Sequence, residues 1–144
     1  MRKLRNLFTQ CVNDLSTSFM NFKIDTREKF TVITPLINSF SDNLTAELNE
    51  LLSSYKQSKI NLIINFKNVS TTNEQVIKQI AAWQNEFYNS KLSFVLCEIQ
   101  QSVKAVLEKL ELDDVLNTAP TETEAWDIVQ LEEIERELSQ NDEE

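Results

Sequence analysis

The chain has 144 residues and a formal net charge of −9, which gives a sequence pI near 4.6. Nucleic-acid phosphates and anionic membrane surfaces would repel so acidic a protein, so we expect neither as a partner. The composition contains no histidine and no glycine. The commonest general base and metal ligand is therefore missing, and so is any glycine-rich phosphate-binding loop. We expect no metal, no cofactor, no membrane insertion and no enzymatic activity.

The two cysteines, Cys11 and Cys97, are too few and too far apart for a disulfide scaffold or a zinc site. This favours a reducing, cytoplasmic setting. Hydrophobic residues make up 41% of the chain, which is sufficient for one core. Without glycine, turns that need a left-handed backbone must use asparagine or aspartate. The asparagines in or near predicted turns are Asn38, Asn65, Asn68 and Asn89.

Residues 1–19 differ in character from the rest of the chain. Three basic residues against one acid give this segment a net charge of +2, and its apolar residues recur at helical spacing. The basic residues are Arg2, Lys3 and Arg5, and the apolar residues are Leu4, Leu7, Phe8, Cys11 and Leu15. Met20 directly precedes a predicted strand over 21–25. Either Met20 is the true start of translation, or residues 1–19 form an N-terminal extension.

A β-hairpin is predicted over residues 23–36. Its apolar residues alternate with polar ones, a polar turn lies at 26–28, and a β-branched run ends near Pro35. A polar loop over 38–43 then leads to a helix predicted over 44–56, because leucines recur there at helical spacing.

The centre of the chain is a buried strand predicted over 60–66, which has five large apolar residues in seven. A polar turn over 67–75 follows, and then a helix with one apolar stripe. The stripe consists of Val76, Ile77, Ile80, Ala81, Trp83 and Phe87, and we expect it to face the core. A turn that joins the carboxyl end of a buried strand to a helix is where open α/β sheets place their sites.

Two overlapping capping boxes are predicted in that turn. Thr71 would pair with Glu74, and Thr72 with Gln75. The hydroxyls of Ser70, Thr71 and Thr72 would then serve as helix caps, although each is also a conceivable phosphate acceptor.

The second half of the chain continues the alternation of strands and helices. A strand is predicted over 92–97, a helix over 101–110, a short strand over 115–118, and a last helix that begins at Thr121 and is anchored by Trp126. Such an order predicts a small, mixed, mostly parallel sheet with an antiparallel hairpin at its edge and about four helices.

The last fourteen residues contain seven acids and one arginine, for a net charge of −6. We interpret residues 131–144 as an acidic, solvated tail and residues 20–130 as the folded domain.

The order of elements and the stretch from Leu62 to Ser70, LIINFKNVS, resemble the STAS domain, the fold of bacterial anti-sigma-factor antagonists. The family's signature is a buried strand, a turn with one hydrophobic residue, here Val69, and then D-S-[ST]-G at a helix start. The later helix also matches, with Val103, Leu107 and Leu112 at the family's spacing and Glu111 where the family prefers glycine.

The departure lies in the signature itself, where this chain has Asn73-Glu74-Gln75-Val76. In the family the first serine is phosphorylated by a partner kinase that is also the anti-sigma factor. Glu74 occupies the matching position and cannot be phosphorylated, so the resemblance implies an antagonist-like module without the usual serine switch. Two interpretations of Glu74 stay open: a fixed substitute for phosphoserine, or an ordinary first-turn acid.

The resemblance therefore implies a non-catalytic protein–protein interaction module, with an anti-sigma factor or related kinase as its partner and a monomeric or weakly dimeric state. The loop over 38–43 is a possible extension of the docking surface. The predicted partner-binding residues are Asn68, Ser70, Thr71, Thr72, Asn73, Glu74 and Gln75. Two alternatives remain: a STAS-like subunit of a larger assembly such as a lipid-transport complex, and an enzyme that works without histidine.

Overall fold

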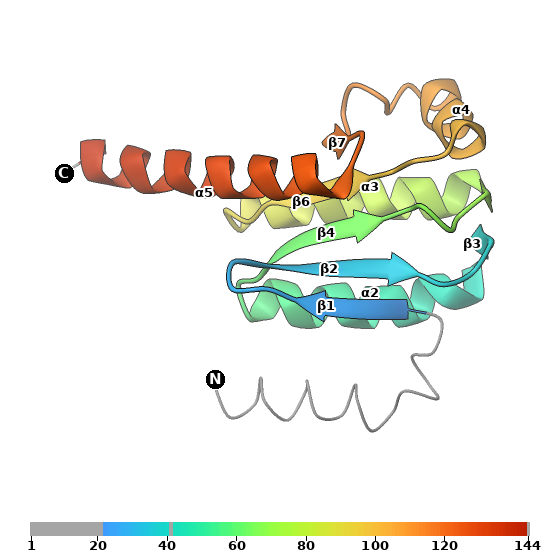
Figure 1. Ribbon diagram of the computed structural model, residues 1–144, viewed down its shortest axis with the longest axis horizontal. Helices are drawn as coiled ribbons and strands as arrows, with labels where there is room; N and C mark the ends of the chain where they lie inside the picture. The colour runs from blue at the N-terminus through green and yellow to red at the C-terminus, as the bar shows by residue number, and fades with distance from the viewer. Residues whose placement is uncertain (1–21, 41, 144) are drawn as a thin grey trace.

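The structure is a computed structural model that describes residues 22–40 and 42–143; the expectations for residues 1–19 and for a start at Met20 lie outside this range. Its main sheet has five strands in the order β1-β2-β4-β6-β7 (Figure 1). These strands are β1 (Phe22–Thr26), β2 (Phe30–Pro35), β4 (Asn61–Asn65), β6 (Phe94–Cys97) and β7 (Thr118–Ala119). β1 is antiparallel to β2 and the other neighbours are parallel, which confirms the predicted mixed α/β fold.

The opening hairpin forms as predicted. The backbone N–H of Arg27 donates to the Phe30 carbonyl at 2.7 Å and closes the turn. Phe22 then lies opposite Pro35 in the register. β1 is therefore the edge strand, and it begins at the end of the sheet where the parallel strands finish.

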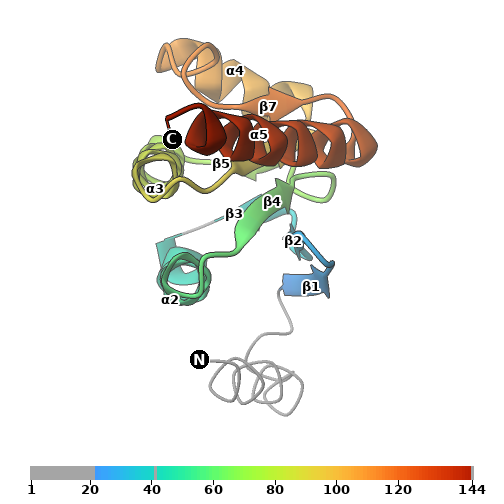
Figure 2. The ribbon, with the colours of Figure 1, turned by 90° about the vertical axis from the view of Figure 1, so that its left-hand side faces the viewer.

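The described helices are α2 (Asp42–Gln57), α3 (Glu74–Asn89), α4 (Gln101–Lys109) and α5 (Glu122–Glu143). Figure 2 shows α2 and α3 on one side of the sheet and α5 on the other. Side chains of β4 alternate between the two layers, because successive residues of a strand point to opposite faces. Leu62 and Ile64 join the α2–α3 core, and Ile63 joins the α5 core; all three are completely buried.

α5 packs on the sheet through Ala125 and Val129, which are completely buried. Trp126 lies beside them, with its ring centroid 5.6 Å from that of Phe30, so it anchors the helix as expected. The helix continues without a break to Glu143, and the predicted boundary between domain and acidic tail falls inside it.

Two short strands were not anticipated. β3 (Ser39–Phe40) lies in the predicted polar loop, and β5 (Thr71–Thr72) lies in the predicted turn. They pair with each other in parallel to form a separate two-stranded sheet. The first helix also begins at Asp42, two residues before the predicted start at Leu44.

The expectation that asparagines would take the left-handed positions is wrong for the described residues. Positive φ values occur instead at Lys59, Lys91, Glu98 and Glu111, between 53° and 62°. Three of these follow the ends of α2, α3 and α4, where the C′ position of a helix commonly adopts this conformation. Glu111, with φ 58°, stands where the STAS pattern prefers glycine. The backbone geometry explains that preference, because glycine has no Cβ to clash in this region.

Candidate functional site

One buried apolar side chain anchors the turn after β4 to the core. Val69 is completely buried in the α2–α3 core, and its N–H donates to the Phe66 carbonyl at 3.0 Å. The Asn65 side-chain oxygen accepts from the N–H of Lys67 at 2.9 Å. Val69, the hydrophobic residue expected in this turn, therefore anchors the turn to the core at the point where the chain leaves the sheet.

The next residues are fastened to the segment that follows β2. The carbonyl of Asn38 accepts from the N–H of Ser70 at 2.7 Å, from the N–H of Thr71 at 3.0 Å, and from the Ser70 hydroxyl at 3.1 Å. The Asn68 amide donates to the Pro35 carbonyl at 3.2 Å. Ser102, in α4, donates its hydroxyl to the carbonyl of Ser70. Ser70 and Asn68 therefore tie three segments together.

The predicted capping boxes are wrong. α3 begins at Glu74 and its N-cap is Asn73, whose side-chain oxygen accepts from the N–H of Val76 at 2.9 Å. Thr71 and Thr72 are extended in β5 and pair with Ser39 and Phe40, so they lie before the helix start. The hydroxyl oxygen of Thr72 is buried without a hydrogen-bond partner, whereas Thr71 is exposed.

Glu74, the first residue of α3, forms an ion pair with Lys109 in the last turn of α4, with Oε1 2.9 Å from Nζ. The hydrogen bond and the charge of the Lys109 ammonium lower the pKa of Glu74 below its usual value. Both side chains remain accessible, with 44% and 74% of their surfaces exposed. The pair therefore presents a carboxylate at a helix N-terminus, where the helix dipole also favours negative charge.

Of the predicted partner-binding residues, Asn73 and Gln75 are exposed and flank the half-exposed Glu74. Asn68 and Ser70 lie deeper and act mainly as braces, while Thr72 has its hydroxyl turned inward. Sequence reasoning missed Lys109 and Ser102. The position of Lys109 in the last turn of a predicted helix was visible, but nothing local indicated that this turn would lie beside Glu74.

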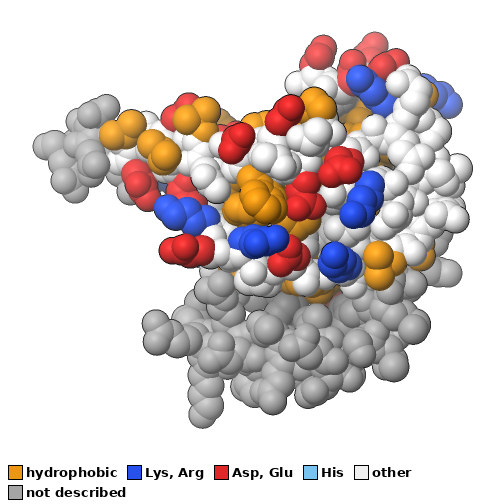
Figure 3. Space-filling model, viewed as in Figure 1, with side chains coloured by type: hydrophobic (Ala, Val, Ile, Leu, Met, Phe, Trp, Pro, Cys, Tyr) orange, Lys and Arg blue, Asp and Glu red, His pale blue; other side chains and the backbone are white. Residues whose placement is uncertain are grey.

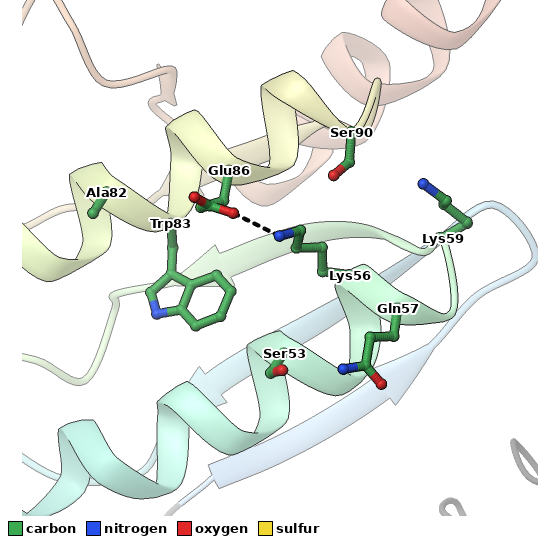
Figure 4. Close-up of a pocket in the computed structure, with 8 residues that line it drawn as sticks. All are labelled: Ser53, Lys56, Gln57, Lys59, Ala82, Trp83, Glu86 and Ser90. Atoms are coloured by element: carbon green, nitrogen blue, oxygen red, sulfur yellow. Dashed lines mark hydrogen bonds and ion pairs between the residues drawn. The ribbon is translucent and has the colours of Figure 1, made fainter.

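A separate hollow of about 490 Å³ lies between α2 and α3 (Figure 4). Lys56 and Glu86 face each other across it, with Nζ 2.6 Å from Oε2. Trp83 lines it and donates its ring N–H to the Asn49 side-chain oxygen at 2.7 Å. Trp83 is half-buried against the core, as its stripe predicted. Glu86 is the only acid among the described residues that line the hollow, and it is paired with Lys56. It lies twelve residues along α3 from Glu74, about 18 Å away along the helix.

Two carboxylates meet at the carboxyl end of β4 and β6. The Asn65 amide donates to Glu98 at 3.1 Å and to Glu122 at 3.0 Å. The neighbouring thiol of Cys97 is completely buried, and burial together with both carboxylates raises its pKa to about 12. Cys97 is therefore a core residue and remains protonated at neutral pH, as the absence of an activating base suggested.

Two negative findings concern the described residues. Within 22–40 and 42–143, no helix is long and apolar enough to cross a bilayer. The same residues contain no group of three or more acidic or sulfur ligands that could hold a metal ion.

Comparison with known proteins identifies the fold. No curated protein sequence matches the chain. Among solved structures, the Bacillus anti-sigma factor antagonist SpoIIAA in its unphosphorylated form has a TM-score of 0.65 and 19% identity, over 76% of this chain and 96% of that chain. A STAS domain protein from Planctomyces limnophilus has a TM-score of 0.62 and 16% identity, over 72% and 92% of the two chains.

A variant of Moorella thermoacetica RsbS, in which a serine is replaced by glutamate, has a TM-score of 0.61 and 21% identity, over 76% of this chain and 94% of that chain. The sequence profile of the STAS domain matches residues 22–125, which is most of the chain. That match begins with β1, ends in the first turn of α5, and contains the turn over 67–75 and the start of α3. The chain therefore belongs to the STAS domain family.

Proposed function

We propose that this protein is a non-catalytic, cytoplasmic interaction module that binds an anti-sigma factor or a related kinase. The docking surface is the turn over 67–75 together with the start of α3. The observation that carries the proposal is the placement of Glu74: a half-exposed carboxylate at a helix N-terminus, braced by Lys109 and flanked by the exposed Asn73 and Gln75. An exposed polar surface of this kind suits recognition of a protein better than catalysis, which usually takes place in a cleft.

In this proposal Glu74 supplies a permanent negative charge in place of a phosphorylation switch. SpoIIAA has been solved in unphosphorylated and phosphorylated forms, and the RsbS variant carries glutamate in place of a serine. A carboxylate carries about half the charge of a phosphate and has fewer acceptor oxygens. If a phosphate acceptor exists nearby, Thr71 suits that role best, because Ser70 is bonded to Asn38 and the Thr72 hydroxyl is buried.

The assembly-subunit alternative would require an apolar patch on the outer side of α3. Within this helix, Tyr88 is the single large apolar residue that is strongly exposed. One exposed aromatic residue does not make a patch. We therefore keep the assembly subunit as an outcome of the experiment.

The test is co-purification of the full chain from native cytoplasm, with mass spectrometry of the bait and its partners. The bait is compared with Glu74→Lys and with a control, Glu124→Lys, which makes the same charge change in the first turn of α5. We expect a stoichiometric anti-sigma factor or kinase with the native chain and the control, and its loss with Glu74→Lys. Equal recovery of the partner with all three baits would show that Glu74 does not contribute to the interface. Recovery of transport subunits alone would refute the proposed partner.

A further inference from the structure

Three apolar side chains on the outer side of α5 are uncovered. Leu131, Ile134 and Leu138 are 57%, 50% and 57% exposed, and we call them the α5 stripe. Their spacing of three and four residues places them on one face of the helix. At about 100° per residue, that face lies opposite the buried Ala125 and Val129. Figure 1 shows this half of α5 extending past the sheet, and Figure 3 shows hydrophobic side chains along it.

The α5 stripe differs from the scattered hydrophobic residues that protein surfaces commonly expose. In the part of the chain that the structure describes, six large hydrophobic residues are at least half exposed. Leu36, Tyr88 and Val115 lie apart in three different segments, whereas the other three form the α5 stripe. The strongly exposed large hydrophobic side chains of the described residues therefore gather at this one place.

Polar contacts on the inner side of α5 keep the stripe facing outward. Ser93 donates its hydroxyl to Glu132 at 2.6 Å and accepts from Arg136 at 3.2 Å. Asn61 donates its side-chain amide to Glu133 at 3.1 Å. These bonds hold the middle of α5 against the amino ends of β4 and β6. The helix cannot rotate to bury the stripe without breaking them.

The charges beside the stripe have one sign. The spacing of the stripe fits the a, d and next a positions of a coiled-coil heptad. Glu135 and Glu137 then occupy the e and g positions that flank the seam, and Asp127 occupies the preceding d position; all three are exposed. The single basic residue of α5, Arg136, is turned inward to Ser93. The outer face is therefore apolar along its seam and acidic beside it.

This charge pattern selects among possible occupants. A second copy of α5 would place acid against acid in either orientation, because both flanking positions carry glutamate. An anionic membrane surface would repel the same acids. The occupant that fits is an amphipathic helix with leucine or isoleucine along its seam and lysine or arginine beside it.

We propose that the α5 stripe is a docking surface for a basic amphipathic helix of a protein partner, which packs on α5 as in a two-stranded coiled coil. Its apolar side chains cover the stripe, and its basic side chains pair with Glu135 and Glu137. Figure 2 shows α5 on the opposite side of the sheet from α3. The inference therefore goes beyond the proposed function, because a helix seated here leaves Glu74 accessible.

Binding of synthetic peptides to the full chain tests this proposal. The basic probe is about three heptads long, with leucine at a and d and lysine at e and g; the acidic probe has glutamate at e and g instead. Repulsion between like charges at these positions keeps each probe from pairing with itself. Isothermal titration measures the affinity of each probe. We expect saturable binding of the basic probe and no binding of the acidic one.

Two single variants separate docking on the stripe from general attraction to an acidic protein. Ile134→Asp places a charged group in the apolar contact, so it should weaken binding of the basic probe about tenfold. Attraction by net charge alone would instead become stronger, because the variant adds a negative charge. The matched control, Val115→Asp, adds the same charge at a 59% exposed position outside the stripe and should bind the probe as the native chain does. Circular dichroism checks that both variants are folded, as expected for sites that are at least half exposed.

Reversing the flanking charges tests the role of Glu135 and Glu137. The double variant Glu135→Lys with Glu137→Lys should bind the acidic probe more tightly than the basic one, the opposite preference to that of the native chain. Binding of the basic probe to the native chain should weaken as salt is added, because these acids are exposed.

Three results would overturn the proposal. The first is failure of the basic probe to bind, or equal binding to the native chain and Ile134→Asp. The second is sedimentation of the native chain as a dimer that Ile134→Asp dissociates, which would show that a second copy covers the stripe. The third is binding to vesicles of anionic lipid that Ile134→Asp abolishes, which would assign the stripe to a membrane surface.

Discussion

Val69 should determine both the stability of the domain and the position of the proposed docking surface. Val69→Ala removes two methyl groups from a completely buried site, at about 0.8 kcal/mol each. The residual space adds up to about 1 kcal/mol, depending on how far the neighbours relax. We therefore expect the free energy of unfolding to fall by about 2 kcal/mol. For a domain of this size, that corresponds to a decrease in Tm of roughly 8–12 °C.

Urea unfolding followed by circular dichroism gives this value directly. The matched control is Val115→Ala, because Val115 also lies in a connection between elements but is 59% exposed. The control should change stability by less than about 0.5 kcal/mol. If Val69→Ala matched the control at an unchanged m-value, the turn would not be anchored in the core. Val69 would then not fix the position of the turn, contrary to what its complete burial indicates.

Three further predictions concern the helix ends. Asn73→Ala should lower stability by about 1 kcal/mol, measured by chemical denaturation, because it removes the N-cap of α3; an unchanged stability would contradict this assignment. Glu111→Gly should raise stability by up to about 1 kcal/mol, since glycine adopts a positive φ without strain, and a lower Tm would show that the Glu111 side chain contributes more than its backbone costs. In an NMR titration the pKa of Glu74 should lie below the usual glutamate range, and Lys109→Met should raise it. Because folding lowers this pKa, the ion pair is intact above the ordinary pKa of glutamate and is lost as the pH falls through the pKa of Glu74 in the folded state.

Most of the architecture was visible in the sequence because its signals are local. The alternation of residues 22–35 and the apolar run at 60–66 depend on neighbours in the chain. The hairpin and the central strand were therefore predicted within one or two residues. β3 and β5 could not be predicted, because two-residue strands exist only through pairing between segments 32 residues apart. The same pairing keeps Thr71 and Thr72 out of the helix start and leaves the cap to Asn73.

The left-handed positions show a second limit of local reasoning. Asparagine tolerates a positive φ better than lysine or glutamate, yet Lys59, Lys91, Glu98 and Glu111 adopt it. The packing of the helices and strands on either side determines where the chain must turn. The residue at that position then adopts a positive φ despite its conformational strain. The ion pair between Glu74 and Lys109 is a comparable case. It joins two helices across 35 residues of sequence, and only the assembled fold brings them together.

The two interpretations of Glu74 can be separated by reversing its ion pair. Glu74→Lys with Lys109→Glu keeps opposite charges at the two positions but moves the negative charge from the start of α3 to the end of α4. If Glu74 is only a first-turn acid paired with Lys109, the double variant should recover partner affinity that Glu74→Lys alone loses. If a partner reads the negative charge at the start of α3 itself, the double variant should bind as weakly as the single one. Isothermal titration against the co-purified partner measures the difference, and full recovery would refute the role of Glu74 as a fixed phosphoserine substitute.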